Sequence, residues 1–273
     1  MGSAKSIVVK PITAKAANDV VRHVHYSGKV VPNSQLHLGV FIGGGLEGAM
    51  SFGPSMDKRK SQKFVHGTKW NGFLELNRMA FSERLPRNSE SRAISVAMKM
   101  IRKTYKHIEW VVSYADGAQC GDGTIYRASG FMLTGIKVNT SMIRFPDGEV
   151  YATLPITNGG SSSNGSALRR RLCDKWGIPY YSGATVGPFL KIGAEYIKGY
   201  QLRYIYFLNK EAKERLAIPI LPFSEIDRYR AGMYRGVPKC ASSETSDTPG
   251  SQLGKGGATP TDALHLTTET ADA

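Results

Sequence analysis

The stretch NGFLELNRMAFSERLPRNSESRAISVAMKMI, residues 71–101, decides the fold of this chain. Its first part is apolar enough for a strand, and its last part carries apolar residues at helical spacing from Ile94 to Ile101. The joint between them, residues 82–92, holds three arginines and no glycine. Phosphate-binding turns between a strand and a helix usually need glycine, because the backbone must approach the ligand closely. The sequence therefore predicts a strand, an arginine-rich joint and a helix.

The regions around this unit predict a mixed α/β fold with a partly antiparallel central sheet flanked by helices. Expected before it are a strand, a helix and two strands that meet at a glycine turn, at residues 6–13, 14–28, 36–45 and 46–55. Expected after it are a buried strand, a short helix, two strands, a basic helix and an aromatic-rich strand, at residues 108–117, 120–131, 132–139, 141–151, 168–177 and 201–216. Residues 1–238 are interpreted as one domain with a flexible loop at 157–166, and residues 239–273 as a disordered acidic tail.

The chain is strongly basic, with a net charge of +14. After residue 239 it carries one lysine and five acidic residues, so the preceding part carries about +18. Such a charge indicates a polyanion partner, first of all nucleic acid, although solubility alone is the alternative explanation. The apolar runs are too short to span a membrane, and the three widely spaced cysteines fit neither a zinc site nor a disulfide framework. A reducing cytoplasm is the expected setting.

One short motif is specific. The fragment GTIYRASGF, residues 123–131, follows the buried strand and places Tyr126 four residues before Gly130. It resembles the strand-then-helix motif of the GNAT acyltransferase superfamily, which implies a GNAT-like fold with Tyr126 beside the sulfur of the donor. Residues 82–92 then take the place of the pyrophosphate-binding turn of that superfamily. The usual Q/R-x-x-G-x-G/A pattern is absent there, so the joint differs from an ordinary coenzyme A site.

A longer resemblance covers residues 20–150 and extends toward 210. HYSGKVVPNSQLHLGVF, FLELNRMAF, PRNSESRAIS and SYADGAQCGDGTIYRASGF together resemble the Mom proteins of Mu-like phages. This resemblance implies that residues 1–238 are a GNAT-like catalytic domain that converts adenine in DNA to N6-(carbamoylmethyl)adenine. It implies an enzyme that protects phage DNA from restriction in the cytoplasm of the infected bacterial host. Chemistry at N6 also requires the adenine to be flipped out of double-stranded DNA.

The joint at residues 82–92 contains the candidate residues for an anionic donor. A helix that begins near Asn88 or Ser89 offers free N–H groups and the positive end of its dipole. Arg87 and Arg92 add fixed charge, and Ser91 adds a hydroxyl donor beside Asn88 and Ser89. These residues would hold a phosphate of coenzyme A, of a transfer RNA end or of DNA. The alternative is an ordinary helix cap with solvated arginines.

The candidate catalytic residues lie at strand and helix ends. His25 and Tyr26 end the first predicted helix, and the resemblance assigns them to the acceptor pocket or a metal, the alternative being one buried and one solvated histidine among His23 and His25. Asp116 is the candidate general base for the weakly nucleophilic adenine amine, and its alternative role is to cap the following loop. Tyr126, whose ordinary pKa is near 10, is the candidate general acid at the leaving group.

Two further residues carry open alternatives. Arg78 lies in an apolar strand, so it is expected either to pair with Glu75, Glu90 or Asp116 or to point into the site. Cys120 has the chemistry of a nucleophile, but no basic partner lies near it in the sequence, and most lone cysteines are packing residues.

The resemblance leaves the donor open between glycyl-tRNA and acetyl-CoA, with transfer RNA a partner in the first case. N6-glycyladenine and N6-(carbamoylmethyl)adenine are isomers, so glycyl transfer to N6 followed by rearrangement would give the product. Radical chemistry at iron, held by His25 and Asp116 and a tyrosine, is the third option, although one histidine and one carboxylate make a thin ligand set.

Contacts with DNA are expected from basic and aromatic side chains. The basic candidates are Asp57–Lys63, Arg169–Arg171, Lys191, Lys198 and Arg203, and the stacking candidates are Trp70, Tyr180 and Tyr181. Two other classes of protein compete with the DNA-modifying enzyme. One is a non-catalytic DNA-binding protein, and the other is a GNAT N-acetyltransferase that acts on a small amine or a protein.

Overall fold

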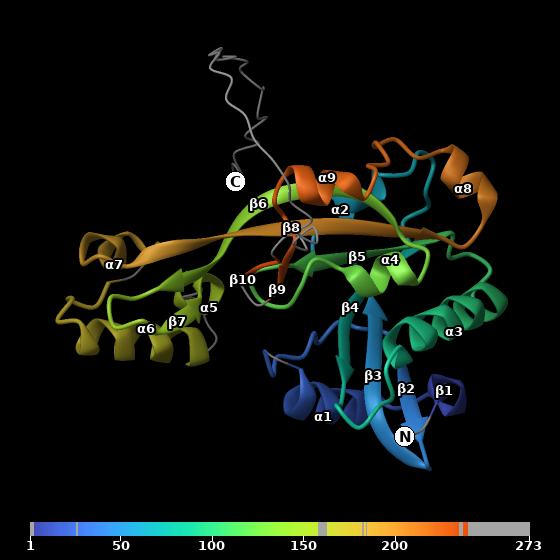
Figure 1. The fold of residues 1–273 in the computed structure, drawn as a ribbon, viewed down its shortest axis with the longest axis horizontal. Coiled ribbons are helices and arrows are strands. Elements are labelled where there is room, and N and C mark those ends of the chain that lie inside the picture. The colour runs from blue at the N-terminus through green and yellow to red at the C-terminus, as the bar shows by residue number, and fades with distance from the viewer. Residues whose placement is uncertain are drawn as a thin grey trace, which may run out of the picture. The chain divides into compact units, whose positions relative to one another are not determined.

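The computed structural model describes residues 3–25, 27–157, 163–181, 183, 185–234 and 237–239. Its main sheet has the order β1–β2–β3–β4–β5–β8–β6–β7 (Figure 1). The strands are β1 (Val8–Pro11), β2 (Leu36–Ile42), β3 (Gly45–Gly53), β4 (Phe73–Phe81), β5 (Trp110–Asp116), β6 (Met132–Arg144), β7 (Val150–Ala152) and β8 (Glu195–Phe207). Among the described strands of this sheet, only β4 and β5 pair in parallel. The predicted mixed α/β class with a partly antiparallel central sheet is confirmed, and most of the strand pairs are antiparallel.

Helices lie along the sheet at several points. The longer ones are α1 (Ala14–Val24), α3 (Ser89–Thr104) and α6 (Ser163–Lys175). The shorter ones are η1 (Ala4–Ser6), α2 (Lys58–Gln62), α4 (Thr124–Ala128), α5 (Thr153–Thr157), α7 (Gly187–Lys191), α8 (Lys210–Glu214) and α9 (Ser224–Arg228). A two-stranded sheet joins β9 (Met233–Tyr234) to β10 (Val237–Pro238). Among the described residues, no helix is both long and apolar enough to cross a membrane.

The strand–joint–helix unit forms as its sequence predicts. β4 leads through residues 82–88 into α3, which buries Ala93, Ile94, Ala97, Met98 and Ile101 against the sheet. Because α3 crosses from β4 to β5, these two strands run parallel. Their pairing covers only Phe73–Glu75 against Trp110–Val112. Beyond that point β4 and β5 diverge, so the later residues of both strands leave their facing edges unpaired within the described chain.

A β-bulge at Asn77 sets the direction of Arg78. Phe52 of β3 pairs with Leu76 and Ser51 pairs with Arg78, so Asn77 is the extra residue of β4. Without the bulge, Leu76 and Arg78 would share one face of the sheet. With it, Leu76 faces the main core and Arg78 faces the side of α1.

The described residues contain three apolar clusters. The main core lies between the sheet and α3 and α4, and includes Tyr126, Phe131 and Tyr204. A second cluster packs around Trp110 on the opposite face of β5. A third, which we call the outer core, lies at the far half of the long β6–β8 pair with α5, α6 and α7 (Figure 1). Its buried residues are Ile143, Phe145, Ile156, Leu172, Cys173, Val186, Phe189 and Ala194.

Some predicted boundaries were wrong. The two strands predicted at 132–139 and 141–151 are one strand, β6, because it pairs with β8 almost throughout despite a register shift between Asn139 and Met142. β8 begins at Glu195, earlier than predicted, and the basic segment after Asp57 contains α2. α6 begins at Ser163, inside the predicted loop 157–166, whose residues 158–162 lie outside the described residues.

The predicted acidic tail lies outside the described residues except at its first position. There Lys239 is ordered, because its Nζ atom lies 2.8 Å from Oδ2 of the buried Asp122.

Candidate active site

The joint before α3 manages without glycine because Asn88 takes its role. Asn88 has a φ of +69° and is the N-cap residue of α3. Asparagine tolerates this left-handed conformation better than most residues. Its side chain makes no capping hydrogen bond, and no acceptor among the described residues pairs with the backbone N–H groups of Glu90 and Ser91. Two donors at the positive end of a 16-residue helix are therefore available to an anion.

A cavity of about 340 Å³ lies beside these N–H groups. It is lined by residues from the joint and from α4: Phe81, Ser82, Glu83, Leu85, Pro86, Arg87, Asn88, Glu90, Ser91, Thr124, Ile125 and Ala128. The structure thus brings together three of the five residues predicted to bind the donor, namely Arg87, Asn88 and Ser91. The carboxylates of Glu83 and Glu90 share the cavity, so its lining is not purely cationic.

Ser89 and Arg92 lie differently from the other predicted donor-binding residues. The Ser89 hydroxyl is fully buried and donates to the Pro86 carbonyl oxygen at 2.6 Å, so it holds the joint in shape. Arg92 is exposed and is not one of the residues that line the cavity.

Tyr126 lies in the main core and does not itself line this cavity. It belongs to α4, whose Thr124, Ile125 and Ala128 line the cavity, and its own side chain is buried. Its ring packs against Phe131 and Tyr204, with centroids 5.4 and 5.3 Å away. Burial raises the pKa of Tyr126 to about 12, and the nearby Cys120 and Glu75 act in the same direction. The phenol is protonated at neutral pH, as it also is at the ordinary pKa near 10, so the shift itself does not favour a proton donor.

Asp116 caps the turn that follows β5. One carboxylate oxygen accepts the Ala118 N–H at 3.0 Å, and the other accepts the Gln119 side-chain amide at 2.7 Å. The capping role that the sequence offered as an alternative is thus present. Each carboxylate oxygen still has a further lone pair, so capping and proton acceptance are compatible.

Cys120 is held in the same turn. Its thiol donates to the Asp116 carbonyl oxygen at 3.1 Å, and burial raises its pKa above the ordinary value. A buried thiol with a raised pKa is a poor nucleophile, which favours the packing role for Cys120.

His25 and Arg78 form a second group on the α1 side of the sheet. His25 follows the last residue of α1, and Tyr26 lies outside the described residues. Nδ1 of His25 accepts the Ser27 N–H at 3.2 Å and lies 2.8 Å from the Ser27 hydroxyl. A backbone N–H only donates, so this ring nitrogen carries no proton. Burial, and then the charge of Arg78, lower the pKa of His25 to about 4.

Arg78 is half-buried, and its hydrogen-bond partners differ from the carboxylates expected for it. Nε donates to the Lys29 carbonyl oxygen and Nη1 to the Asn77 carbonyl oxygen, each at 2.8 Å. Among the described residues its guanidinium is thus held by two backbone carbonyls rather than by Glu75, Glu90 or Asp116. The bulge at Asn77 is the reason, because it turns Arg78 away from the core face.

The sequence of this chain is similar to those of known proteins. The model of the Mom protein family matches residues 6–225, which include every candidate residue named above. The chain belongs to the Mom protein family. It is 37% identical over 216 residues to the methylcarbamoylase mom of Escherichia phage Mu, a match that covers 78% of this chain and 80% of that protein.

Solved structures resemble this Mom family member only weakly. An acetyltransferase from Bacillus subtilis in complex with CoA is 11% identical, with 74% of this chain and 98% of that chain covered and a TM-score of 0.36. FeeM, an N-acyl amino acid synthase from uncultured soil microbes, is 19% identical, with 47% of this chain and 80% of that chain covered and a TM-score of 0.35.

Sequence reasoning on this Mom family chain named Glu75 only as a partner for Arg78 and did not single out His37. Glu75 is the last β4 residue paired with β5, and its charge acts on the buried phenols of both Tyr126 and Tyr114. His37 is buried, and its Nδ1 lies 2.9 Å from the Ser51 hydroxyl. Ser51 is the β3 residue that pairs with Arg78. A charged or titratable residue inside a core strand was the available signal for both.

An iron site does not fit the described residues. No group of three or more His, Cys, Asp or Glu side chains among them is arranged to hold a metal ion. His25 lies at the end of α1 beside Arg78, whereas the Asp116 carboxylate accepts hydrogen bonds within the turn after β5. A guanidinium beside a histidine also disfavours a cation there.

Two predicted DNA contacts have side chains that are bonded within the protein, and for the fully buried Arg169 the prediction is wrong. Arg169 is fully buried and donates to the carbonyl oxygens of Ile156, Thr157 and Tyr181. Arg203 donates to Thr134 and lies 4.2 Å from the centroid of the Phe64 ring.

The aromatic candidates for DNA contact divide in the same way. Trp70 and Tyr180 are exposed, each beneath a cation: Lys58 over Trp70 and Arg170 over Tyr180. Tyr181 is half-buried, and its hydroxyl donates to the Thr185 carbonyl oxygen at 2.6 Å.

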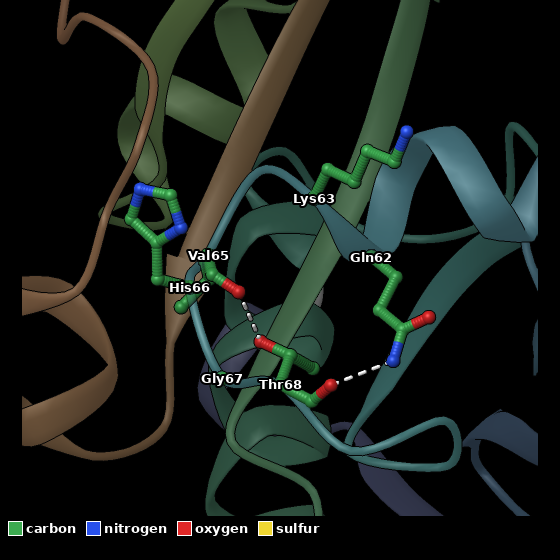
Figure 2. A pocket seen from close by; sticks show the side chains of 6 residues that line it. All are labelled: Gln62, Lys63, Val65, His66, Gly67 and Thr68. Carbon is green, nitrogen blue, oxygen red and sulfur yellow. Dashed lines mark hydrogen bonds between the residues drawn. The ribbon is translucent and has the colours of Figure 1, made fainter.

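A second cavity, of about 330 Å³, lies in the loop that follows α2 (Figure 2). Gln62 donates to the Thr68 carbonyl oxygen at 2.7 Å, and the Thr68 hydroxyl donates to the Val65 carbonyl oxygen at 2.8 Å. Both hydrogen bonds join residues of the same segment, 62–68, and hold its conformation. None of the predicted catalytic residues lines this cavity.

The lowered pKa of His25 predicts a dependence of stability on pH. The folded protein keeps this ring neutral down to about pH 4, whereas the unfolded chain protonates it near the ordinary value of 6.5. The stabilising contribution is therefore complete above pH 6.5 and is lost as the pH falls toward 4. Because the ring is only partly buried, we expect a loss on the order of 1–2 kcal/mol in the free energy of unfolding.

Urea titrations of wild type and His25→Gln between pH 4 and pH 7 measure this contribution. The wild type should lose more stability than the variant over that range. Parallel curves for the two proteins would contradict the assignment.

Proposed function

We propose that this chain is a transferase that converts adenine in double-stranded DNA to N6-(carbamoylmethyl)adenine. The observation that carries the proposal is the 37% identity over 216 residues to the phage Mu methylcarbamoylase. The family match at residues 6–225 contains all the candidate residues. The net charge of +14 supports a polyanionic substrate. The product would protect phage DNA from restriction, in the cytoplasm of the infected bacterium.

Asp116 is the proposed general base. Adenine N6 is a poor nucleophile because its lone pair is delocalised into the ring, so attack requires loss of an N6 proton. The bonds from Ala118 and Gln119 fix the Asp116 carboxylate at the end of β5 and leave lone pairs on both oxygens. The capping bonds would therefore orient the base without consuming it.

Tyr126 is the proposed general acid. Its burial keeps the phenol protonated, and its contacts with Phe131 and Tyr204 fix the ring. It shares α4 with residues that line the cavity beside the joint. A leaving group of a donor bound in that cavity would therefore be close to the element that carries the acid.

The cavity beside the joint is the proposed site for the phosphate of the donor. The free N–H groups of Glu90 and Ser91, with the Arg87 guanidinium, supply the donors. Such a site accepts the 3′ end of a transfer RNA as well as coenzyme A.

Glycyl-tRNA is the donor that gives the product by a balanced route. N6 attacks the glycyl ester carbon, the ester C–O bond breaks, and the transfer RNA leaves with its 3′ hydroxyl protonated. The free glycyl amine then attacks C6 and forms a five-membered spiro ring. Breakage of the original C6–N6 bond leaves the carbamoylmethyl group on the new nitrogen. His25, Arg78 and Tyr26 are proposed to face the adenine in this reaction.

Mass spectrometry of nucleosides from plasmid DNA of expressing cells tests the function. Wild type should give an adenine of carbamoylmethyl mass, and Asp116→Asn should lower its yield by about 10²–10⁴-fold. Tyr126→Phe should also lower it, because it removes the proton donor and keeps the ring. Gln119→Ala removes one of the two bonds that orient Asp116 but keeps the carboxylate, so it should lower the yield less than Asp116→Asn does.

Two results would contradict the proposal. Full modification by Asp116→Asn would remove Asp116 from the chemistry. Unmodified adenine in cells that express the wild type would favour an acetyltransferase of small amines or proteins, which acetyl transfer from acetyl-CoA would then reveal. The donor is decided separately: glycine label supplied as glycyl-tRNA to enzyme and DNA should appear on adenine.

A further inference from the structure

Met56 is the most exposed large apolar side chain of the described residues. Its exposed fraction is 94%, well above the 49% of Trp70 and of Ile220. It lies in the turn between β3 and α2. A single exposed apolar residue is common on protein surfaces, so its exposure alone indicates nothing.

The turn that carries Met56 is anchored on both sides. The Ser55 and Ser61 hydroxyls are buried and lie 2.9 Å apart, and the Asp57 carboxylate accepts the Lys60 N–H at 2.9 Å as the N-cap of α2. Met56 itself donates its backbone N–H to Glu75 at 3.4 Å. The structure therefore holds an apolar side chain out into solvent from an ordered turn rather than from a loose loop.

Cations surround this turn. Lys58, Arg59, Lys60 and Lys63 follow Met56 within seven residues. Lys58 also lies 4.5 Å from the centroid of the exposed Trp70 ring. This combination of cations and exposed apolar side chains matches a surface that grips phosphates and contacts bases.

The turn is attached to β4 where that strand leaves β5. The Asn77 side-chain amide donates to the Pro54 carbonyl oxygen at 3.2 Å, and Glu75 accepts from Met56. Asn77 is the bulge residue that directs Arg78 toward His25. The turn that carries Met56 is thus joined through two hydrogen bonds to β4, the strand that carries Arg78.

We propose that Met56 enters the base stack of duplex DNA and fills the space that the extruded adenine leaves. This inference rests on the proposed function, because modification of N6 requires the adenine to leave the stack. Unstacked neighbours lose contacts, and an apolar side chain of suitable size replaces them. Methionine suits this role because it is long, unbranched and adaptable. The cations of α2 hold the flanking phosphates while the side chain is inserted.

Three variants test the insertion of Met56 into the base stack, which we call the wedge. Met56→Ala removes the side chain beyond Cβ, Met56→Leu keeps an apolar side chain of similar volume, and Ile220→Ala truncates another exposed apolar residue outside the turn. Equal thermal midpoints will show that all three fold, as expected for exposed positions. Nucleoside mass spectrometry of plasmid DNA from expressing cells gives the first readout. Met56→Ala should lose about tenfold or more of the modified adenine, whereas Met56→Leu and Ile220→Ala should stay near wild type.

The second readout needs neither donor nor reaction. Purified protein is bound to relaxed plasmid in the presence of topoisomerase I, and the linking number is read after deproteinisation. Side-chain insertion unwinds DNA, so wild type and Met56→Leu should shift the linking number and Met56→Ala should not.

Failure of the wedge and failure of the proposed function give different results. Modification or unwinding by Met56→Ala at the wild-type level would overturn the wedge, and so would an unshifted linking number with bound wild type. Absence of modified adenine with the wild type, together with Met56-dependent unwinding, would instead overturn the proposed function and leave an inserting side chain.

Discussion

Replacement of Gly123 by alanine should lower the free energy of unfolding by about 2–4 kcal/mol and abolish the proposed DNA modification. Gly123 is the N-cap residue of α4 and has a φ of +79°, which strains any residue with a Cβ. A Cβ there would also overlap the Tyr204 ring, lying 2.8 Å from its Cζ atom. Tyr204 cannot retreat easily, because it is fully buried and its hydroxyl donates to the Asp122 carbonyl oxygen at 2.6 Å.

Loss of activity should follow because Tyr204 packs directly against Tyr126. Displacing one ring displaces the other, together with the α4 wall of the cavity beside the joint. Gly148→Ala is the matched control: Gly148 has a φ of +86°, but no atom lies within 4 Å of the added Cβ. The free energy of unfolding of Gly148→Ala should fall by only about 1 kcal/mol, the cost of the backbone strain, and the variant should keep full activity. Equal losses of stability in the two variants, measured by urea unfolding, would contradict the clash.

Replacement of Arg169 by alanine should destabilise the outer core by about 3–5 kcal/mol. Its guanidinium is fully buried and donates to Ile156 at 2.6 Å, Thr157 at 2.9 Å and Tyr181 at 3.2 Å. Its charge also lies 5.2 Å from the centroid of the Tyr181 ring. Truncation leaves three carbonyl oxygens without these donors and opens a cavity where a large side chain was.

Hydrogen exchange resolved by peptide measures this loss where it occurs. Exchange should accelerate in α5 and α6 of Arg169→Ala, while α3 in the main core stays protected. Arg170→Ala is the control, because Arg170 is exposed and lies over the face of the exposed Tyr180 ring. It should lose less than about 1 kcal/mol. Similar hydrogen-exchange rates in the two variants would show that the bonds of Arg169 to the three carbonyl oxygens do not stabilise the outer core.

Local patterns allowed much of the fold to be predicted. The helical spacing after residue 88 identifies α3, and two glycines with positive φ at 43–44 identify the β2–β3 hairpin. Both signals are local, because they depend on residues a few positions apart. The joint at residues 82–92 was identified for the same reason.

Other features depend on register and packing between distant segments, which spacing does not give. The bulge at Asn77 requires knowledge of the pairing with β3, and it decides where Arg78 points. The burial of Arg169 depends on contacts with the carbonyls of residues 12 or more positions away. Arg169 was therefore mistaken for a DNA contact, whereas the two arginines that follow it, Arg170 and Arg171, are exposed.

The long β6–β8 pair has a mechanical consequence. In the described part of the chain, the outer core joins the main core through these two strands, which carry a register shift between Asn139 and Met142. A two-stranded ribbon twists more readily than a wide sheet, and a bulge concentrates that twist at one point. Torque applied to the outer core would therefore be absorbed in the ribbon near Asn139, and the geometry around Tyr126 would be shielded from it.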